Sequence, residues 1–181
     1  MSAFGAPVAI QTEHLLLRRL TRDDAKDIFE GWAQDLDVTR FLLWHPHRSI
    51  EDTHAFLAHC DEAWADGREF SWGVIPRAER TLVGTIGLRV AGHRAEFGYA
   101  FARAVWGRGY ATEAARAVVE SALAMPAIAR VWAYVDVENV RSARVLEKAG
   151  LTREGCLRSW HLPSGFGVPR DAWCYAKVKE P

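Results

Sequence analysis

Two glycines surround an arginine directly before an alanine-rich stretch, at Gly107, Arg108 and Gly109. Glycine weakens a helix by about 1 kcal/mol relative to alanine, so these glycines do not serve helix formation. A strand ending near Phe101, a glycine loop and a helix beginning near Tyr110 form a recurrent anion site, because the N–H groups of the first helical turn point outward. Gly107 and Gly109 remove Cβ atoms that would block a phosphate, and Arg108 adds a charge-assisted contact. An isolated G-x-G is equally consistent with a turn that binds nothing.

Two common phosphate loops do not fit this stretch. The Walker pattern G-x-x-x-x-G-K-[ST] is absent. The dinucleotide fingerprint G-x-G-x-x-G fails at its third glycine, where Thr112 stands, and it expects a parallel βαβ unit, whereas this loop follows an antiparallel meander. The sequence therefore favours the pyrophosphate of another nucleotide carrier.

Three motifs in order resemble one known superfamily. The stretch VWGRGYATEA resembles the coenzyme-A loop of the GNAT acetyltransferases, with Trp106 at a position that is Gln or Arg in the general pattern. Trp at that position is typical of the branch that contains the ribosomal-protein N-terminal (Rim-type) acetyltransferases. NVRSARVLEKAGL resembles that branch's second signature, with Leu151 replacing the usual Phe, and AEFGYAF resembles its acid-x-Gly-Tyr strand. The element order agrees from about residue 12 to residue 178.

The resemblance implies that acetyl-CoA donates an acetyl group to an amine. In this fold the strand that holds Tyr99–Phe101 separates from the next strand, and the pantetheine arm lies between them. Asn139 and Ser142 lie three residues apart and share a helix face, which in the family looks toward the thioester sulfur. Asn139 is also a candidate helix N-cap. The cofactor-binding residues that follow are Tyr99, Ala100, Phe101, Trp106, Gly107, Arg108, Gly109, Tyr110, Ala111, Thr112, Asn139 and Ser142.

Attack on a thioester needs a neutral amine, a stabilised carbonyl oxygen and a proton for the leaving thiolate. We expect a backbone N–H of residues 99–101 to stabilise the oxygen and Ser142 to hydrogen-bond or protonate the sulfur. A tyrosine, the more general choice in the family, has no clear equivalent. Glu96 is the first candidate for the general base, against the alternative of a surface ion pair. His161 is the second, against the alternative of a solvated loop histidine.

The expected acceptor is a peptide or protein N-terminus. Deprotonation at pH 7 costs a lysine amine about 4.6 kcal/mol and an α-amine of pKa near 8 about 1.4 kcal/mol, so an α-amine needs only a modest base. Residues 35–48 are expected to hold the cationic amine between carboxylates and an aromatic face. The substrate-binding candidates are Trp32, Asp35, Asp37 and Trp44. A small amine such as an aminoglycoside or polyamine, and a non-catalytic acyl-CoA-binding protein, are the alternatives.

Composition excludes several partners. The 181 residues carry 23 basic and 23 acidic side chains, and no basic stripe indicates nucleic acid. No apolar run approaches the ~18 residues of a membrane span, and the first residues lack the features of a signal peptide. Three cysteines without C-x-x-C spacing indicate free thiols in a cytoplasmic protein. His45 and His47 alone are a poor metal-ligand set, so no metal is expected; a monomer and a homodimer remain open.

Periodicity and capping signals predict one α/β (α+β) domain over residues 1–181, in the order β-α-α-β-β-β-α-β-α-β-β: a mixed, mostly antiparallel GNAT-like sheet with helices on both faces. Thr21 with Asp24 and Ser49 with Asp52 predict two capping boxes. The expected strands are 14–20, 69–77, 81–91, 95–101, 130–137, 153–160 and 171–178; the expected helices are 22–34, 50–66, 110–125 and 140–149. The apolar strand 130–137 is expected to be covered on both faces, and 35–48 and 161–169 to be irregular.

Overall fold

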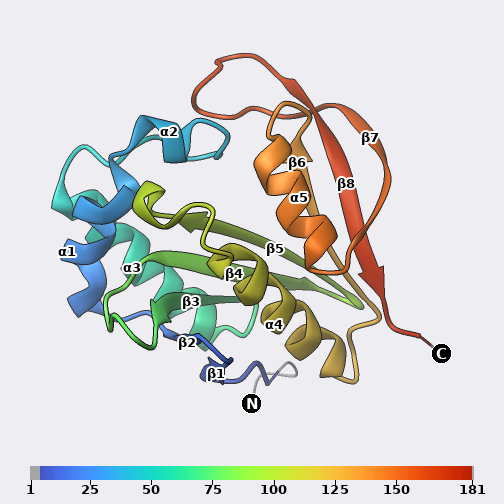
Figure 1. Cartoon of the computed structure of the whole chain (residues 1–181), viewed down its shortest axis with the longest axis horizontal. Helices are drawn as coiled ribbons and strands as arrows, with labels where there is room; N and C mark the ends of the chain where they lie inside the picture. The colour runs from blue at the N-terminus through green and yellow to red at the C-terminus, as the bar shows by residue number, and fades with distance from the viewer. Residues whose placement is uncertain (1–4, 181) are drawn as a thin grey trace.

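The structure, a computed structural model, describes residues 5–180. One eight-stranded sheet runs through the molecule in the order β1-β2-β3-β4-β5-β6-β8-β7 (Figure 1). All neighbouring strands are antiparallel except β5 and β6. The strands are β1 (Ala9–Gln11), β2 (Leu15–Arg19), β3 (Glu69–Pro76), β4 (Gly84–Ala91), β5 (Arg94–Phe101), β6 (Arg130–Asp136), β7 (Thr152–His161) and β8 (Arg170–Val178).

Helical segments connect these strands and confirm the expected α/β class. The α-helices are α1 (Ala25–Ile28), α2 (Leu36–Thr39), α3 (Ile50–Ala65), α4 (Tyr110–Ala124) and α5 (Val140–Lys148), and short 3₁₀ turns cover Arg22–Asp24 and Arg103–Val105. Both expected capping boxes form, at Thr21 with Asp24 and at Ser49 with Asp52. The α3 helix ends before Gly67, whose φ of 66° is in the left-handed region that glycine favours.

Three details differ from the sequence-based expectations. The edge strand β1 was not anticipated, because its three residues are too few to show a period. The first helix is not uniform: a 3₁₀ turn and α1 are followed by a π-helical turn at Phe29–Ala33. The segment 35–48, expected to be irregular, contains the short helix α2, whose N-cap Asp35 accepts a hydrogen bond from the N–H of Asp37.

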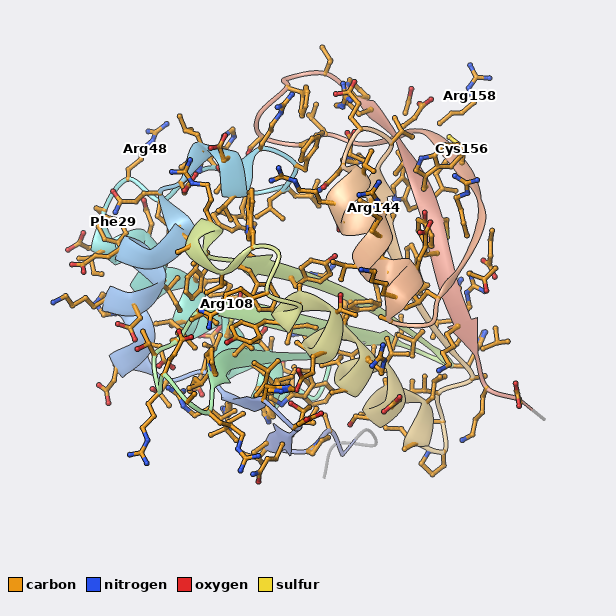
Figure 2. The ribbon with its side chains drawn as sticks, in the orientation of Figure 1. Phe29, Arg48, Arg108, Arg144, Cys156 and Arg158 are labelled. Carbon is orange, nitrogen blue, oxygen red and sulfur yellow. The ribbon has the colours of Figure 1, made fainter. Side chains whose placement is uncertain are left out.

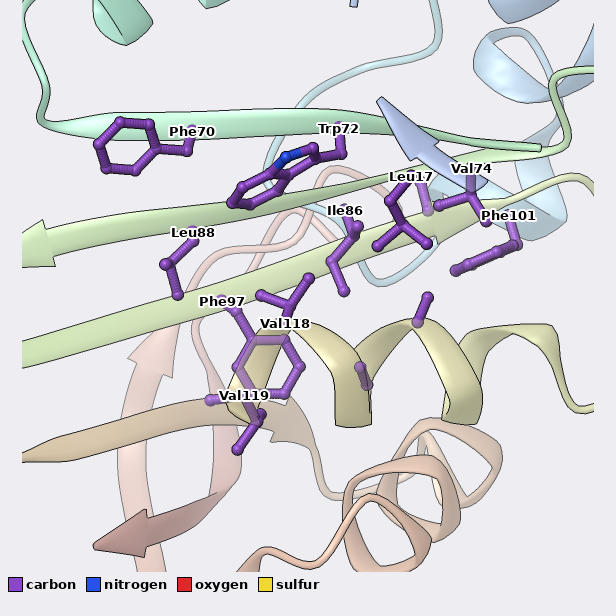
Figure 3. Packing of buried hydrophobic residues seen from close by; sticks show 14 of the residues in the cluster. Leu17, Phe70, Trp72, Val74, Ile86, Leu88, Phe97, Phe101, Val118 and Val119 are labelled. Carbon is purple, nitrogen blue, oxygen red and sulfur yellow. The ribbon is translucent and has the colours of Figure 1, made fainter. Parts of the chain in front are cut away.

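Strand alternation assigns the two faces of the sheet. Trp72, Ile86 and Tyr99 are register partners and therefore share one face. Figure 3 shows Val118 and Val119 of α4 packed over this face. Ser71 alternates with Trp72 and therefore lies on the other face of β3, and α3 packs against this strand. In Figure 1 α4 and α5 lie in front of the sheet and α3 lies behind it.

The expectation that β6 is covered on both faces is wrong for one face. Val131, Ala133 and Val135 are buried, and α4 and α5 pack against this strand. The alternating residues Trp132 and Tyr134 are only partly buried. They face the side of the sheet that also carries Glu96, because Glu96 and Trp132 are register partners. The apolar composition of the strand thus reflects aromatic residues on a partly open surface.

Candidate active site

Strands β5 and β6 separate after a short parallel ladder. Only Arg94–Glu96 pair with Arg130–Trp132, although β5 continues to Phe101 and β6 to Asp136. This separation agrees with the expected splay. The N–H of Ala102 donates to the carbonyl of Val83, so the even-numbered residues of β5 bond to β4. By the same alternation, the N–H and C=O groups of Phe97 and Tyr99 point toward β6, into the splay.

The glycine loop leads from β5 into α4 with two residues in the left-handed region. Gly107 has a φ of 81° and Gly109, the N-cap of α4, a φ of 85°. A Cβ atom built at either position would meet no atom within 4 Å. Packing therefore does not require glycine here; the backbone conformation does, and the same two residues leave the first turn of α4 open to an approaching ligand.

The side chains around this loop are partly engaged. Arg108, which is labelled in Figure 2, forms an ion pair with Glu79 and lies 4.8 Å from the centre of the Tyr110 ring, so its expected phosphate contact would compete with Glu79. The indole N–H of Trp106 donates to the carbonyl of Phe101 at 2.9 Å, which fixes the indole beside the end of β5.

A cation that the sequence analysis missed lies beside this indole. The Arg141 guanidinium of α5 lies 5.5 Å from the Trp106 ring centre, and its side chain is exposed. The sequence signal that could have pointed to Arg141 is its position in the first turn of the helix that follows Asn139. Ala111 and Thr112 lie in the first turn of α4. The loop, Trp106 and the start of α5 thus surround one approach to the splay.

Ser142 and Tyr99 meet on the α5 side of the sheet. The Tyr99 hydroxyl lies 2.7 Å from the Ser142 Oγ, and the Asn139 side chain accepts a hydrogen bond from the Ser142 N–H at 3.2 Å. Asn139 is therefore the N-cap of α5, as expected. Burial raises the pKa of Tyr99 to about 12, although the hydrogen bond to Ser142 opposes the shift. The phenol accordingly stays protonated at neutral pH and can donate to Ser142.

Glu96 lies on the opposite face of β5, because it is three residues from Tyr99 in a strand without a bulge. Glu96 and Trp132 form the last register pair before β5 and β6 separate. Burial raises the pKa of Glu96; the charge of Arg89 lowers it in part. Within residues 5–180 no salt bridge involves Glu96, and Arg89 pairs with Glu69 instead. A half-buried carboxylate without an ion pair is chemically suited to accept a proton.

His161 ends β7 and is buried, so the alternative of a solvated loop histidine is wrong. Only 3% of its side chain is exposed, and Nε2 lies 3.3 Å from the Oδ2 of Asp136. Arg170 also binds this carboxylate, at 2.5 Å from Nε. Burial lowers the pKa of His161, while the charge of Asp136 opposes the shift. This burial limits direct access of an amine to the imidazole.

The expected acceptor pocket is only partly supported. Trp32 is 2% exposed and belongs to the hydrophobic core, so its assignment to a pocket is wrong. Asp35 and Asp37 both pair with Arg103, the second at 2.8 Å, so their charges are already compensated. Trp44 is partly buried, with its ring 5.3 Å from that of His47. Burial and pairing of this kind depend on the tertiary fold and carry no local sequence signal.

Two features are absent from residues 5–180. No three His, Cys, Asp or Glu side chains gather as a metal-binding group in this part of the chain. Among the helices of the same residues, none is long and apolar enough to cross a membrane.

The sheet is splayed between β5 and β6, and an anion-type loop lies at the start of α4. A hydroxyl pair lies on one face of β5 and a carboxylate on the other. Together these features define a class of acyl-CoA-dependent transferases. The comparisons with known proteins agree. Residues 14–152 match the family model described as an acetyltransferase (GNAT) domain. The chain is 32% identical over 173 residues to the uncharacterized N-acetyltransferase YoaA of Bacillus subtilis, which covers 94% of this chain and 96% of YoaA.

Solved structures share the fold. A GNAT-family acetyltransferase from Bacillus anthracis superposes with a TM-score of 0.83 at 28% identity, over 96% of this chain and 99% of that chain. RimL, a ribosomal L7/L12 alpha-N-protein acetyltransferase in complex with coenzyme A, superposes with a TM-score of 0.82 at 19% identity, over 96% and 97% of the two chains. The chain belongs to the GNAT family and is an acetyl-CoA-dependent N-acetyltransferase.

Proposed function

We propose that the enzyme transfers acetyl from acetyl-CoA to the α-amine of a peptide or protein N-terminus, by direct attack of the amine on the thioester. The observation that carries this proposal is the placement of Ser142 with Tyr99 on one face of β5 and of Glu96 on the other. A thioester held in the splay would have its sulfur near the hydroxyl pair and its carbonyl accessible to an amine from the Glu96 side.

The cofactor would be held mainly by backbone groups. The amides of residues 107–112 would bind the pyrophosphate, with Arg141 as the available cation beside Trp106. The groups of Phe97 and Tyr99 that point into the splay would hydrogen-bond the pantetheine arm, and a backbone N–H of residues 99–101 would stabilise the thioester oxygen. Acetyl-CoA supplies the activated acetyl group.

Two proton movements complete the reaction. Glu96, directly or through a water molecule, would remove one proton from the ammonium to give the neutral amine that attacks, and its raised pKa brings it closer to that of the amine. The thiolate would take a hydrogen bond or proton from Ser142, which Tyr99 supports by donating to the serine oxygen. The nitrogen loses its second proton as the carbon–sulfur bond breaks, and this proton goes to the thiolate or replaces the one that Ser142 gives. A single carboxylate of this kind suits an α-amine, which loses its proton far more readily than a lysine. The fold shared with RimL supports the same choice of acceptor.

A screen of acceptors tests the proposal. Release of free thiol from acetyl-CoA would be measured with short peptides that have free N-termini, with the same peptides blocked at the N-terminus, and with polyamines and aminoglycosides. Turnover of the free peptides alone is expected. Turnover of polyamines or aminoglycosides with no peptide turnover would overturn the peptide acceptor and leave the acetyltransferase chemistry in place.

We further propose a cytosolic location, which the free thiols Cys60, Cys156 and Cys174 support.

A further inference from the structure

Tyr134 of β6 faces the same side of the sheet as Glu96, and the proposed reaction does not yet give it a role. Glu96 is the register partner of Trp132, and Tyr134 lies two residues further on, about 7 Å along the strand. Side chains two residues apart in a strand share a face, so Tyr134 lies on the Glu96 side. It stands where β5 and β6 have just begun to separate, on the side from which the acceptor amine would enter.

The position across the splay from Tyr134 carries no side chain. When the register of Glu96 with Trp132 is continued by two residues on each strand, Tyr134 falls opposite Gly98. Gly98 is exposed, and a Cβ atom built there would meet nothing within 4 Å. Its φ does not lie in the left-handed region, so the backbone conformation does not require glycine either. The glycine therefore leaves an open space on the face that carries both Glu96 and Tyr134.

Neighbouring rings hold the Tyr134 side chain while its hydroxyl stays available. The Tyr134 ring centre lies 6.2 Å from that of Trp132 on the same strand and 6.1 Å from that of Trp160 in β7. The His161 ring centre lies 5.5 Å away. Within residues 5–180 the Tyr134 hydroxyl makes no hydrogen bond, and its oxygen is not sealed inside the protein. An accessible phenol without a partner can bind a group that enters the splay.

The charges near Tyr134 keep its proton in place. Burial raises the pKa of Tyr134, and the negative charge of Glu96 raises it further, whereas the charge of Arg89 lowers it in part. The influence of Glu96 on this pKa agrees with the register, because it requires the phenol and the carboxylate to lie within electrostatic reach. The phenol therefore stays neutral at neutral pH. A neutral phenol can donate one hydrogen bond and accept another.

We propose that Tyr134 is a further catalytic residue, whose hydroxyl hydrogen-bonds the acceptor nitrogen in the space beside Gly98. The phenol oxygen accepts from one N–H of the ammonium, while Glu96 accepts from another and takes that proton. With two of its directions fixed, the nitrogen presents its lone pair to the thioester carbon. Tyr134 keeps its own proton throughout, so the proton balance of the reaction is unchanged. The inference rests on the proposed function in one point, the entry of the amine from the Glu96 side, and it holds for a peptide and for a small amine alike.

The test compares Tyr134→Phe with Tyr175→Phe, since each variant loses one hydroxyl. Tyr175 of β8 is the register partner of Ala133 and lies on the α5 face, where its hydroxyl donates to Glu147 at 3.0 Å. The acceptor is whichever amine the wild-type enzyme acetylates, a hexapeptide with a free N-terminus or spermidine. In Tyr134→Phe we expect kcat/KM for the amine to fall about tenfold, as for the loss of one hydrogen bond to a charged group. Acetyl-CoA affinity, measured by calorimetry, should stay at the wild-type value, and Tyr175→Phe should keep both parameters.

A double-mutant cycle shows whether Tyr134 and Glu96 act on the same nitrogen. Tyr134→Phe is combined with Glu96→Gln, and kcat/KM for the amine is measured for the wild type, both single variants and the double variant. Because the two groups hold one nitrogen, Tyr134→Phe should cause a smaller fold-loss in the Glu96→Gln background than in the wild type. A tyrosine that only supports the fold would cause the same fold-loss in both backgrounds.

The other outcomes separate this inference from the proposed function. A wild-type kcat/KM in Tyr134→Phe beside a reduced value in Glu96→Gln would overturn the role of Tyr134 and leave the proposed function in place. Wild-type values in both variants would overturn the entry of the amine from the Glu96 side, and the role of Tyr134 with it. Equal fold-losses in the two backgrounds, or a loss of acetyl-CoA affinity in Tyr134→Phe, would assign the tyrosine to structure.

Gly98→Val tests the same space without any change at Tyr134, and it serves where Tyr134→Phe fails to fold. The valine side chain would occupy the space in which the nitrogen binds, where a Cβ atom meets no other atom within 4 Å. We expect kcat/KM for the amine to fall at least tenfold. A wild-type value in Gly98→Val would overturn the inference.

Discussion

The Tyr99–Ser142 pair places a buried phenol behind the hydroxyl that would face the thiolate. A hydroxyl can donate to sulfur and accept from a neighbour at the same time, so the two groups act in series. The pKa of Tyr99, raised to about 12 by burial, keeps the phenol protonated over the neutral range. A tyrosine therefore contacts the proposed acid, from a strand position that sequence analysis had assigned to cofactor binding.

Removal of each hydroxyl should have a graded effect. Ser142→Ala should lower kcat on the order of 10²-fold with nearly unchanged acetyl-CoA affinity, because its hydroxyl acts on charge that develops as the thiolate leaves. Tyr99→Phe should lower kcat about tenfold at most, since one supporting hydrogen bond is lost. Steady-state kinetics with calorimetry would measure both. A wild-type turnover number in Ser142→Ala would assign the serine to structure alone.

Glu96 should show opposite effects on rate and on stability. Burial raises its pKa in the folded state, so the folded protein holds this proton more tightly than the unfolded chain. The free energy of unfolding that depends on Glu96 is therefore highest at low pH and falls as the pH rises through the unfolded and then the folded pKa. Glu96→Gln should raise the thermal midpoint at neutral pH, lower kcat there, and recover part of the rate at higher pH as free amine becomes abundant. A pH–rate profile parallel to that of the wild type would exclude Glu96 as the base.

At the scale of elements, we expect the loop before α4 to determine cofactor affinity. Gly109→Val adds a β-branched side chain at a φ of 85°, where such residues are strained, and fills the space in front of the first helical turn. We expect a large loss of acetyl-CoA affinity by calorimetry. Gly31→Ala, whose Cβ would meet nothing within 4 Å and which lies outside the loop, is the control. An unchanged dissociation constant in folded Gly109→Val would contradict the assignment of the loop.

Elements whose signals are local were predictable from the sequence. The capping boxes, the helix after Gly109 and the cap at Asn139 depend on residues within three positions of each other, and the structure contains all of them. The burial of Trp32 and of His161 was not predictable, because it results from segments distant in sequence. The hydrogen bond between Ser164 and Thr39, 125 residues apart, is a clear case: neither residue carries a pattern that indicates the other.

At the scale of the whole molecule, the sheet consists of two parts joined by a short ladder. Strands β1–β5 and the group β6, β8 and β7 share only the three register pairs between β5 and β6. The family motifs lie on both parts, which explains why the fold class could be predicted although the strand order could not. The face that each residue occupies follows from register, which no single motif contains.

The arrangement of Ser142 and Glu96 on opposite faces of β5 has a consequence for the order of kinetic events. The nucleotide carrier would approach from the α4 and α5 side and the acceptor from the other, so neither must depart before its partner arrives. Initial rates measured over a grid of both concentrations should therefore give double-reciprocal lines that intersect. Parallel lines, the signature of an acetylated protein intermediate, would indicate instead that a side chain such as the exposed Cys156 carries the acetyl group between two separate half-reactions.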